Sequence, residues 1–347
     1  MTTPDPGPSG EFDLIRRHFT RPAERAVLGV GDDCALLLPA PGMQLAVSSD
    51  MLVEGRHFLS TVPPEALGHK ALAVNLSDLA ACGARPLACT LALSLPRIDE
   101  AFLDGFSRGL LALADAHGCE LVGGDTTQGP LTICITVLGE VPPGRALLRS
   151  GAAPGDWLYV SGAVGEARLA LEAFRGRVGL PQDLFEAARR AMERPEPRVA
   201  LGLALRGVAS SAIDISDGLL GDLGHILARS QVGATVEIDT VPRGPGLALQ
   251  GQALQRECAL AGGDDYELLF TAPPGREAQV MAAAREAGVA VTCIGRIDAE
   301  PGLRLVDGLG APVTRTYLSF DHFRPDPAPP GAGSSSRADA PPPGGRA

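Results

Sequence analysis

The stretch KALAVNLSDLAACG, residues 70–83, contains the feature that decides how the first half of the chain folds. It continues a helical pattern that begins after two prolines, so the sequence predicts a helix over residues 64–82 that stops near Gly83. On that helix Asp78 has Val74, Ala71 and Cys82 as neighbours on one face. A carboxylate in an apolar stripe needs a partner, and the one basic residue of the stretch, Lys70, lies two turns away.

Outward from this helix, strands and helices alternate without the regular strand-helix-strand repeat of a doubly wound sheet. Residues 45–50 and 131–141 are predicted as strands and residues 100–117 as a helix. The second half has predicted strands at residues 156–162, 210–216, 234–239, 267–272 and 291–297, with helices between them. The fold class expected is α+β, in two α+β domains.

Composition changes mark the predicted domain boundaries. A break rich in Pro and Gly, VPPGRALLRSGAAPGD, falls at residues 141–156. We therefore expect a flexible lead at 1–10, an N-terminal domain at 11–145, a C-terminal domain at 150–323 and a disordered Pro/Gly/Ser tail at 324–347. A length of 347 residues agrees with about two domains.

Charge and composition exclude several classes of protein. The formal net charge of −11 makes nucleic acid an unexpected partner. Lys70 is the single lysine among 30 basic residues and fits neither a P-loop nor a protein-kinase site. The N-terminus lacks the pattern of a secretory signal, and no apolar run approaches the roughly 18 residues of a membrane span. The seven cysteines form no C-x-x-C pair, so we expect free thiols and a cytoplasmic protein.

Aspartates follow or interrupt several apolar segments. They are Asp32, Asp33, Asp50, Asp78, Asp125, Asp214, Asp217, Asp264 and Asp265. Such carboxylates repel one another unless cations neutralise them, and hard oxygen ligands suit Mg²⁺ bound together with substrate phosphates. For any single cluster a turn or helix-cap role is the simpler interpretation. A structural role for His57 and a solvated surface position for Arg149 also stay open. The sequence has no HExxH helix, G-x-S-x-G elbow or dinucleotide-binding G-x-G-x-x-G turn.

Nine motifs, taken in order, resemble the thiamine-monophosphate kinase family. They run from residue 10 to residue 323 and are GEFDLIRRHF, GVGDDCALL, SSDMLVEGRHF, KALAVNLSDLAACGARP, GGDTT, RSGAAPGDWLYVSG, SAIDISDGLLGDLGHI, GGDDYELLF and SFDHF. The resemblance implies the fold of aminoimidazole ribonucleotide synthetase, in which the N-terminal domain dimerises through its sheet. It implies direct, in-line transfer of a phosphoryl group from ATP to thiamine monophosphate (TMP), assisted by several Mg²⁺ ions and without a catalytic nucleophile from the protein.

The resemblance also carries site residues onto this sequence. The implied metal ligands are Asp33, Ser48, Ser49, Asp50, Asp78, Asp125, Asp214 and Asp217. The implied ATP contacts are Gly124, Asp125, Arg149 and Ser216, and the implied TMP contacts are His57, Asp264 and Tyr317. Three positions depart from the family pattern: Ser49 replaces a common Thr, Asp264 a frequent Glu, and Tyr317 stands where other aromatic residues occur.

Two alternatives remain at this stage. The first is another ATP-using enzyme of the same superfamily. The second is a non-catalytic protein in which the aspartates only hold divalent ions that stabilise the fold. The motif SSDMLVEGRHF together with Tyr317 favours the kinase, because a metal store would need neither.

Overall fold

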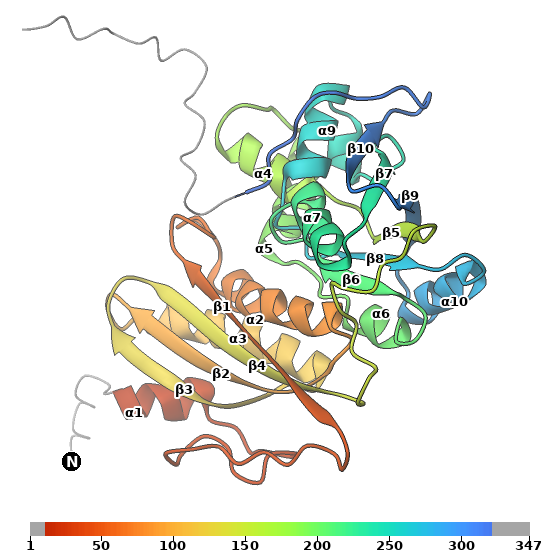
Figure 1. The fold of residues 1–347 in the computed structure, drawn as a ribbon. Helices are drawn as coiled ribbons and strands as arrows, with labels where there is room; N and C mark the ends of the chain where they lie inside the picture. The colour runs from red at the N-terminus through yellow and green to blue at the C-terminus, as the bar shows by residue number, and fades with distance from the viewer. Residues whose placement is uncertain (1–10, 321–347) are drawn as a thin grey trace, which may run out of the picture.

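Two β-sheets, each with its own helices, make up the part of the chain that the computed structural model describes, residues 11–320 (Figure 1). The predicted lead at 1–10 and tail at 324–347 lie outside these residues. None of the helices within 11–320 is long and apolar enough to cross a membrane.

The N-terminal part contains a sheet of order β1-β4-β2-β3. Neighbouring strands are antiparallel except for β2 and β3, which are parallel. Its elements are α1 (Glu11–Leu14), the π-helical turn η1 (Ile15–Phe19), β1 (Gln44–Val53), α2 (Pro64–Ala81), β2 (Arg85–Leu95), α3 (Glu100–His117), β3 (Glu120–Gln128) and β4 (Thr132–Val141). The sequence analysis identified β1, α2, α3 and β4 but not β2 or β3.

Helices α2 and α3 cover one face of this sheet, which we call the inner face (Figure 1). On β4 the inner face carries Ile133, Ile135 and Val137, each at most 1% exposed. The two helices approach closely because glycines face the partner backbone. A Cβ on Gly68 would lie 2.0 Å from the carbonyl oxygen of Phe106 on α3. The tight helix pair holds α2 firmly against β1 and β4.

The opposite, outer face of the sheet is partly uncovered. The segment before β1 covers one end of it, where Ala26 packs with Ala88 and Val122. Along β1, however, Val47 and Met51 are 61% and 55% exposed. Exposed apolar side chains in a row on a sheet are typical of a surface that another molecule covers.

The C-terminal part is built on a sheet of order β10-β7-β9-β5-β8-β6 in which only the β10–β7 pair is parallel. Its elements are β5 (Trp157–Ser161), α4 (Glu166–Phe174), α5 (Gln182–Glu193), α6 (Val199–Ala204), β6 (Ser211–Asp214), α7 (Leu219–Ser230), β7 (Gly233–Glu237), α8 (Pro245–Ala248), α9 (Gln252–Ala261), β8 (Leu268–Ala272), α10 (Glu277–Ala287), β9 (Val291–Asp298) and β10 (Gly302–Val306). The sequence analysis did not identify α8, α9 or β10.

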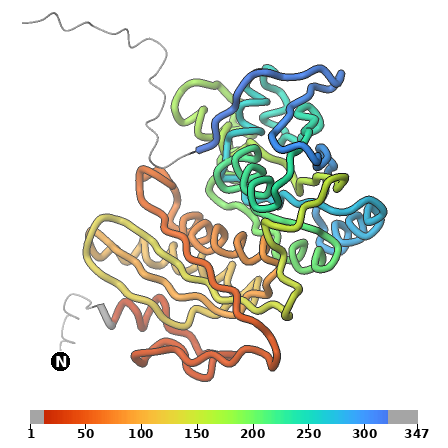
Figure 2. The backbone as a smooth tube through the Cα atoms, viewed as in Figure 1, coloured from red at the N-terminus to blue at the C-terminus, as the bar shows by residue number. Residues whose placement is uncertain are grey.

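Helix α2 joins the two parts, lying between the first sheet and the elements α6 and β6 (Figure 2). Hydrophobic packing continues across this contact, since buried Leu76 and Leu79 of α2 belong to the same cluster as Leu205, Ala212 and Phe270. The helix that carries Asp78 is therefore buried from both sides.

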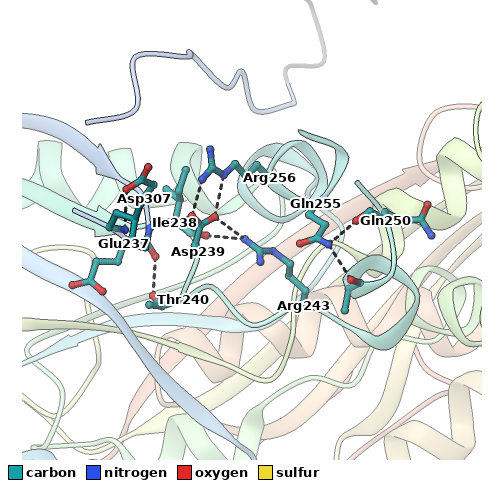
Figure 3. Close-up of polar contacts among 12 residues, drawn as sticks. Glu237, Ile238, Asp239, Thr240, Arg243, Gln250, Gln255, Arg256 and Asp307 are labelled. Carbon is teal, nitrogen blue, oxygen red and sulfur yellow. Dashed lines mark hydrogen bonds and ion pairs between the residues drawn. The ribbon is translucent and has the colours of Figure 1, made fainter. Parts of the chain in front are cut away.

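A separate acidic residue, Asp239, shows how this chain neutralises a structural carboxylate. Arg256 donates to both oxygens of Asp239 at 3.0 and 2.6 Å, and Arg243 lies 3.6 Å from it (Figure 3). The guanidinium of Arg256 holds the pKa of Asp239 below its usual range, with help from the backbone amide of Gly308. Asp239 is thus fully paired within the protein.

Candidate active site

Three polar side chains of α2 face neighbouring strands from within an apolar helix. They are Asn75, Ser77 and Asp78, and the first two are at most 1% exposed. Asn75 donates from Nδ2 to the carbonyl of Ala71 at 3.0 Å, and its Oδ1 accepts the backbone N–H of Asp50 at 3.0 Å. The amide therefore fixes β1 at the residue that the sequence analysis predicted as a metal ligand.

Asp78 lies opposite β1 and accepts a hydrogen bond from Ser48 Oγ at 2.5 Å. Burial raises the pKa of Asp78, while the Ser48 hydrogen bond and the charge of Arg149 act in the opposite direction. Burial dominates, so this carboxyl group holds its proton more tightly than an ordinary aspartate.

Asp214, at the end of β6, is 4% exposed and accepts a hydrogen bond from Ser77 Oγ at 2.7 Å. Burial raises its pKa strongly, and the negative charge of Asp78 raises it further. Consecutive residues of α2 thus contact two predicted metal ligands from different domains: Ser77 reaches Asp214, and Asp78 reaches Ser48.

Asp50 completes a group of acidic residues that we call the carboxylate cluster: Asp50, Asp78, Asp214 and Asp217. The pKa of Asp50 is raised to about 6, first by burial and then by the charges of Asp78 and Asp217. Within residues 11–320 no arginine or lysine forms an ion pair with any of the four. In contrast to Asp239, the four carboxylates repel one another without a directly paired protein cation in the described residues, although Arg149 lies close enough for its charge to act on Asp78.

The turn between β6 and α7 is fixed by Asp222, which is 3% exposed. Its Oδ2 accepts the backbone N–H groups of Ser216, Asp217 and Gly218, each at 3.1 Å. Burial is the main reason that the pKa of Asp222 is raised to about 7, and the Asp217 charge adds to it. The buried carboxyl orients Ser216 and Asp217, both predicted site residues, toward the surface.

A cavity of about 330 Å³ opens beside the cluster at the junction of the two domains. Ser48, Asp78, Arg149 and Asp214 line it together with apolar side chains such as Leu79 and Ile213. Arg149 is exposed and comes from the connection between β4 and β5. A cavity with one arginine, two carboxylates and an apolar wall can accommodate a nucleotide phosphate next to a metal ion.

The loop between α9 and β8 carries Asp264 in an unusual conformation. Gly263, Asp264 and Tyr266 all have positive φ angles, of 69°, 64° and 53°. The loop is held to the β6–α7 turn because the N–H of Asp264 donates to the carbonyl of Ser216 at 2.8 Å. Strained backbone of this kind persists where surrounding contacts enforce it, and it is frequent at functional sites.

The turn after β1 contains His57, whose Nδ1 accepts the backbone N–H of Val53 at 3.0 Å. The guanidinium of the preceding Arg56 lies 5.1 Å from the ring centroid of Phe320. Tyr317, the aromatic residue singled out in the sequence, is instead 8% exposed within the core of the second domain, with Arg315 over its ring at 5.2 Å. The structure therefore brings Phe320, and not Tyr317, to the His57 turn.

Four predicted site residues lie apart from the carboxylate cluster. Ser49 and Asp125 lie on the outer face of the sheet, whereas Asp78 lies on the inner face. The register aligns Asp125 with Met51 across three strand spacings, about 14 Å. Asp33 is exposed in the segment before β1. Gly124 has φ 148°, and a Cβ there would lie 1.8 Å from the Leu91 carbonyl, so strand pairing alone requires a glycine.

The described residues contain no preformed group of three His, Cys, Asp or Glu side chains close enough to hold a metal ion. The acidic residues of the carboxylate cluster lie in one region, but their oxygens do not surround a single metal position. Such an arrangement fits Mg²⁺, which is commonly bound by one or two carboxylates plus substrate phosphates.

Comparison with known proteins decides the family. The AIR synthase related protein N-terminal domain model matches residues 31–141, and the corresponding C-terminal domain model matches residues 153–308. The curated thiamine-monophosphate kinase of Salmonella typhimurium is 46% identical over 323 residues, covering 90% of this chain and 98% of the relative. The chain belongs to the thiamine-monophosphate kinase family.

Solved structures agree with this assignment. The thiamine-monophosphate kinase from Stenotrophomonas maltophilia K279a superposes with a TM-score of 0.77 at 46% identity, covering 81% of this chain and 91% of that one. AaThiL complexed with AMPPCP and TMP gives a TM-score of 0.72 at 29% identity, covering 82% and 89%. The family and the fold class predicted from the sequence, two α+β domains of the AIR synthase type, are confirmed.

Several residues that organise the site of this thiamine-monophosphate kinase family member were not identified from the sequence. They are Asn75, Ser77, Asp222, Tyr266 and Phe320. A signal existed for two of them, since Asn75 and Ser77 interrupt the same apolar helix as Asp78. No comparable signal pointed to Asp222, because an aspartate near a helix N-terminus is ordinary.

Proposed function

We propose that this chain phosphorylates TMP with ATP to give thiamine diphosphate and ADP, the final step of thiamine diphosphate synthesis. An oxygen of the TMP phosphate attacks the γ-phosphorus of ATP in line, and the bond to the β,γ-bridging oxygen breaks. Membership of the kinase family supports this activity over both alternatives, another ATP-using enzyme and a passive metal binder. The observation that carries the proposal is the carboxylate cluster formed by both domains.

The residues of the cluster fit divalent magnesium. Asp50, Asp78, Asp214 and Asp217 offer hard oxygen ligands, and burial with mutual repulsion makes cation binding favourable. Ser48 would assist through its hydroxyl. When bound, Mg²⁺ supplies positive charge against the phosphates of ATP and TMP.

The protein itself supplies orientation and charge. Arg149 enters the cavity beside Asp78 and would pair with a phosphate group bidentately. Ser216 is exposed at a turn that Asp222 holds rigid, where it would contact ATP. These groups would keep the two substrates in line, which is the main requirement of phosphoryl transfer.

The TMP site is proposed near the His57 turn and Asp264. His57 would contact the phosphate, and Asp264 would accept a hydrogen bond from the thiamine moiety. The ring of Phe320, already beneath the Arg56 cation, would stack on the cationic thiazolium. For Tyr317 the contact implied by the resemblance stays a prediction, which its burial does not favour.

A homodimer formed through residues 11–145 belongs to this proposal. The exposed Leu45, Val47 and Met51 on the outer face support it. Ser49 and Asp125 lie on that same face, so a second copy packed there would meet both residues. The predicted metal-ligand roles of Ser49 and Asp125 therefore depend on the dimer. The same holds for the predicted ATP contacts of Gly124 and Asp125. The role of Asp33 and the cytoplasmic location stay predictions.

The deciding experiment is a coupled assay of ADP release from ATP and Mg²⁺, with TMP or with plain thiamine as acceptor. We expect turnover with TMP and formation of thiamine diphosphate by chromatography. Turnover with neither acceptor, alongside Mg²⁺ binding by calorimetry, would instead support the passive metal binder. Turnover with another phosphate acceptor but not TMP would support a different enzyme of the superfamily.

A further inference from the structure

The single lysine of the chain is buried at the junction of the two domains. Lys70, on α2, is 2% exposed. Its Nζ donates to Asp264 Oδ2 at 2.6 Å and to the carbonyl of Met192, at the end of α5, at 2.9 Å. A buried ammonium is tolerated only where such partners compensate its charge, so its position is tightly defined.

The Asp264 carboxylate is held by Lys70 and still reaches solvent, since its side chain is 34% exposed. Tyr266, which is 8% exposed, also forms a hydrogen bond with the Asp264 side chain. Asp264 has a left-handed backbone conformation, with φ 64°. Its side chain therefore leaves the loop in a different direction than it would from an extended backbone.

Other contacts anchor the same loop to the predicted ATP and metal site. The N–H of Tyr266 donates to the carbonyl of Ile215 at 2.8 Å, and the N–H of Asp264 donates to that of Ser216. Lys70 itself lies two turns before Asp78 on one rigid helix. The ammonium therefore links the Asp264 carboxylate to the helix that carries part of the carboxylate cluster.

We propose that Lys70 is a positioning residue for TMP: its ammonium fixes the Asp264 carboxylate so that the second oxygen is presented to the substrate. This inference rests on the proposed function, in which Asp264 contacts TMP. Lys70 touches neither substrate and acts through Asp264. Misplacing a binding carboxylate by a fraction of an ångström weakens the one contact it makes, and leaves ATP binding largely unchanged.

A double-mutant cycle tests the proposal by steady-state kinetics on the full-length protein. We expect Lys70→Met to raise the KM for TMP about tenfold while the ATP KM and kcat change by less than about threefold. On an Asp264→Asn background, Lys70→Met should add less than about twofold, since its target is already gone. Lys70→Arg, which keeps the charge, should recover part of the TMP affinity. The control Arg304→Met, which breaks a 3.3 Å ion pair with Asp298 far along the sheet, should leave both KM values unchanged.

A second measurement needs no variant. Labelling with ¹⁵N-lysine gives one side-chain ammonium resonance, because the chain has one lysine. We expect this resonance to shift on adding TMP and to change little with the ATP analogue AMPPCP alone. No shift at saturating TMP, or fully multiplicative effects in the cycle, would overturn the role of Lys70. Wild-type protein that does not turn over TMP would instead refute the proposed function, so the two failures are distinguishable.

Discussion

Ser77 Oγ on α2 donates a hydrogen bond of 2.7 Å to Asp214 Oδ2 on β6, which joins the two domains at a buried carboxylate. This is the one hydrogen bond that lowers the pKa of Asp214, against burial and the charges of Asp78, Asp222 and Asp50, which raise it. The hydroxyl therefore helps Asp214 to reach the ionised form that a metal ion requires.

Ser77→Ala should weaken metal binding. Loss of a hydrogen bond to a charged group costs about 1.5–3 kcal/mol, so the Mg²⁺ concentration for half-maximal activity should rise about tenfold or more. A magnesium titration of the kinase assay measures this. The control is Ser107→Ala on α3, a similarly buried helical serine whose Oγ bonds only to a backbone carbonyl. An unchanged Mg²⁺ requirement would mean that the Ser77 contact is purely structural.

Asp50→Asn and Asp78→Asn should each lower kcat at least about 100-fold, or roughly 2.7 kcal/mol of transition-state stabilisation. Each change removes one negative charge from the carboxylate cluster and preserves side-chain size. High Mg²⁺ should restore part of the rate. The fold should persist, because removing one carboxylate relieves repulsion in the metal-free protein.

Asp298→Asn is the matched control for these two variants. Asp298 accepts a hydrogen bond from Thr235 at 2.7 Å and pairs with Arg304, away from the carboxylate cluster. Its activity should be close to that of the wild type. If both Asp50→Asn and Asp78→Asn keep wild-type turnover at limiting Mg²⁺, the metal-ligand roles of these aspartates are wrong and their roles are structural.

The stability of the metal-free protein should fall as the pH rises from about 5 to 8. The folded-state pKa values of Asp50 and Asp222, about 6 and 7, exceed the value of 3.8 for an ordinary aspartate. Between these values the folded state binds more protons than the unfolded state, so the free energy of unfolding decreases with pH. Thermal denaturation should show a Tm lower by several degrees at pH 8 than at pH 5.5.

Added Mg²⁺ should reduce this loss, because the ion binds the ionised carboxylates and stabilises the folded state by mass action. Its stabilising effect should therefore be larger at pH 8 than at pH 5.5. The same scans with and without Mg²⁺ measure the difference. A Tm that rises with pH in the absence of metal would contradict the raised pKa values of Asp50 and Asp222.

Elements with a clear apolar pattern were predictable from the sequence. Strands that mix glycines and polar residues with apolar ones were not. Helix α2 and strand β4 contain long apolar patterns, which indicate the element without knowledge of its tertiary contacts. Strand β3 reads ELVGGDTTQ, in which two glycines and five polar residues resemble a loop. Its pairing with β2 depends on Gly124 passing close to Leu91, a tertiary contact that local pattern does not reveal.

The same distinction holds for the candidate site. Asp50, Asp78 and Asp214 were identified because each stands out against apolar neighbours, and the structure brings them together. Which face of the sheet Asp125 occupies depends on the register of β3 against β2, two strands that were not identified from the sequence. The choice between Tyr317 and Phe320 depends on how the chain after β10 returns over the second domain, for which no periodic pattern exists.

Substitution of these two aromatic residues should separate binding from packing. Phe320→Ala should raise the KM for TMP several-fold to tens-fold, since one aromatic contact with a cation contributes about 0.5–2 kcal/mol. Tyr317→Ala should mainly lower stability, by about 3–5 kcal/mol, because it opens a cavity in the core. Kinetics and thermal denaturation of both variants measure the split. A selective effect of Tyr317→Ala on TMP, without loss of Tm, would reinstate the contact implied by the family resemblance.

The outer face of the first sheet should mediate dimerisation. Val47 is 61% exposed on β1, between exposed Leu45 and Met51, and a second copy would bury all three. Sedimentation equilibrium at micromolar concentration should give twice the chain mass of 35.8 kDa. Val47→Glu places an unpaired charge in this contact and should weaken dimerisation at least about 100-fold.

Leu309→Glu is the control for this change, since Leu309 is 95% exposed in the loop after β10 and away from the sheet. That variant should sediment like the wild type. Because Ser49 and Asp125 lie on the outer face, the Val47→Glu monomer should also lose activity, and activity should return as protein concentration rises toward the weakened dissociation constant. A wild-type monomer at micromolar concentration, or a fully active Val47→Glu monomer, would contradict a site that depends on the dimer.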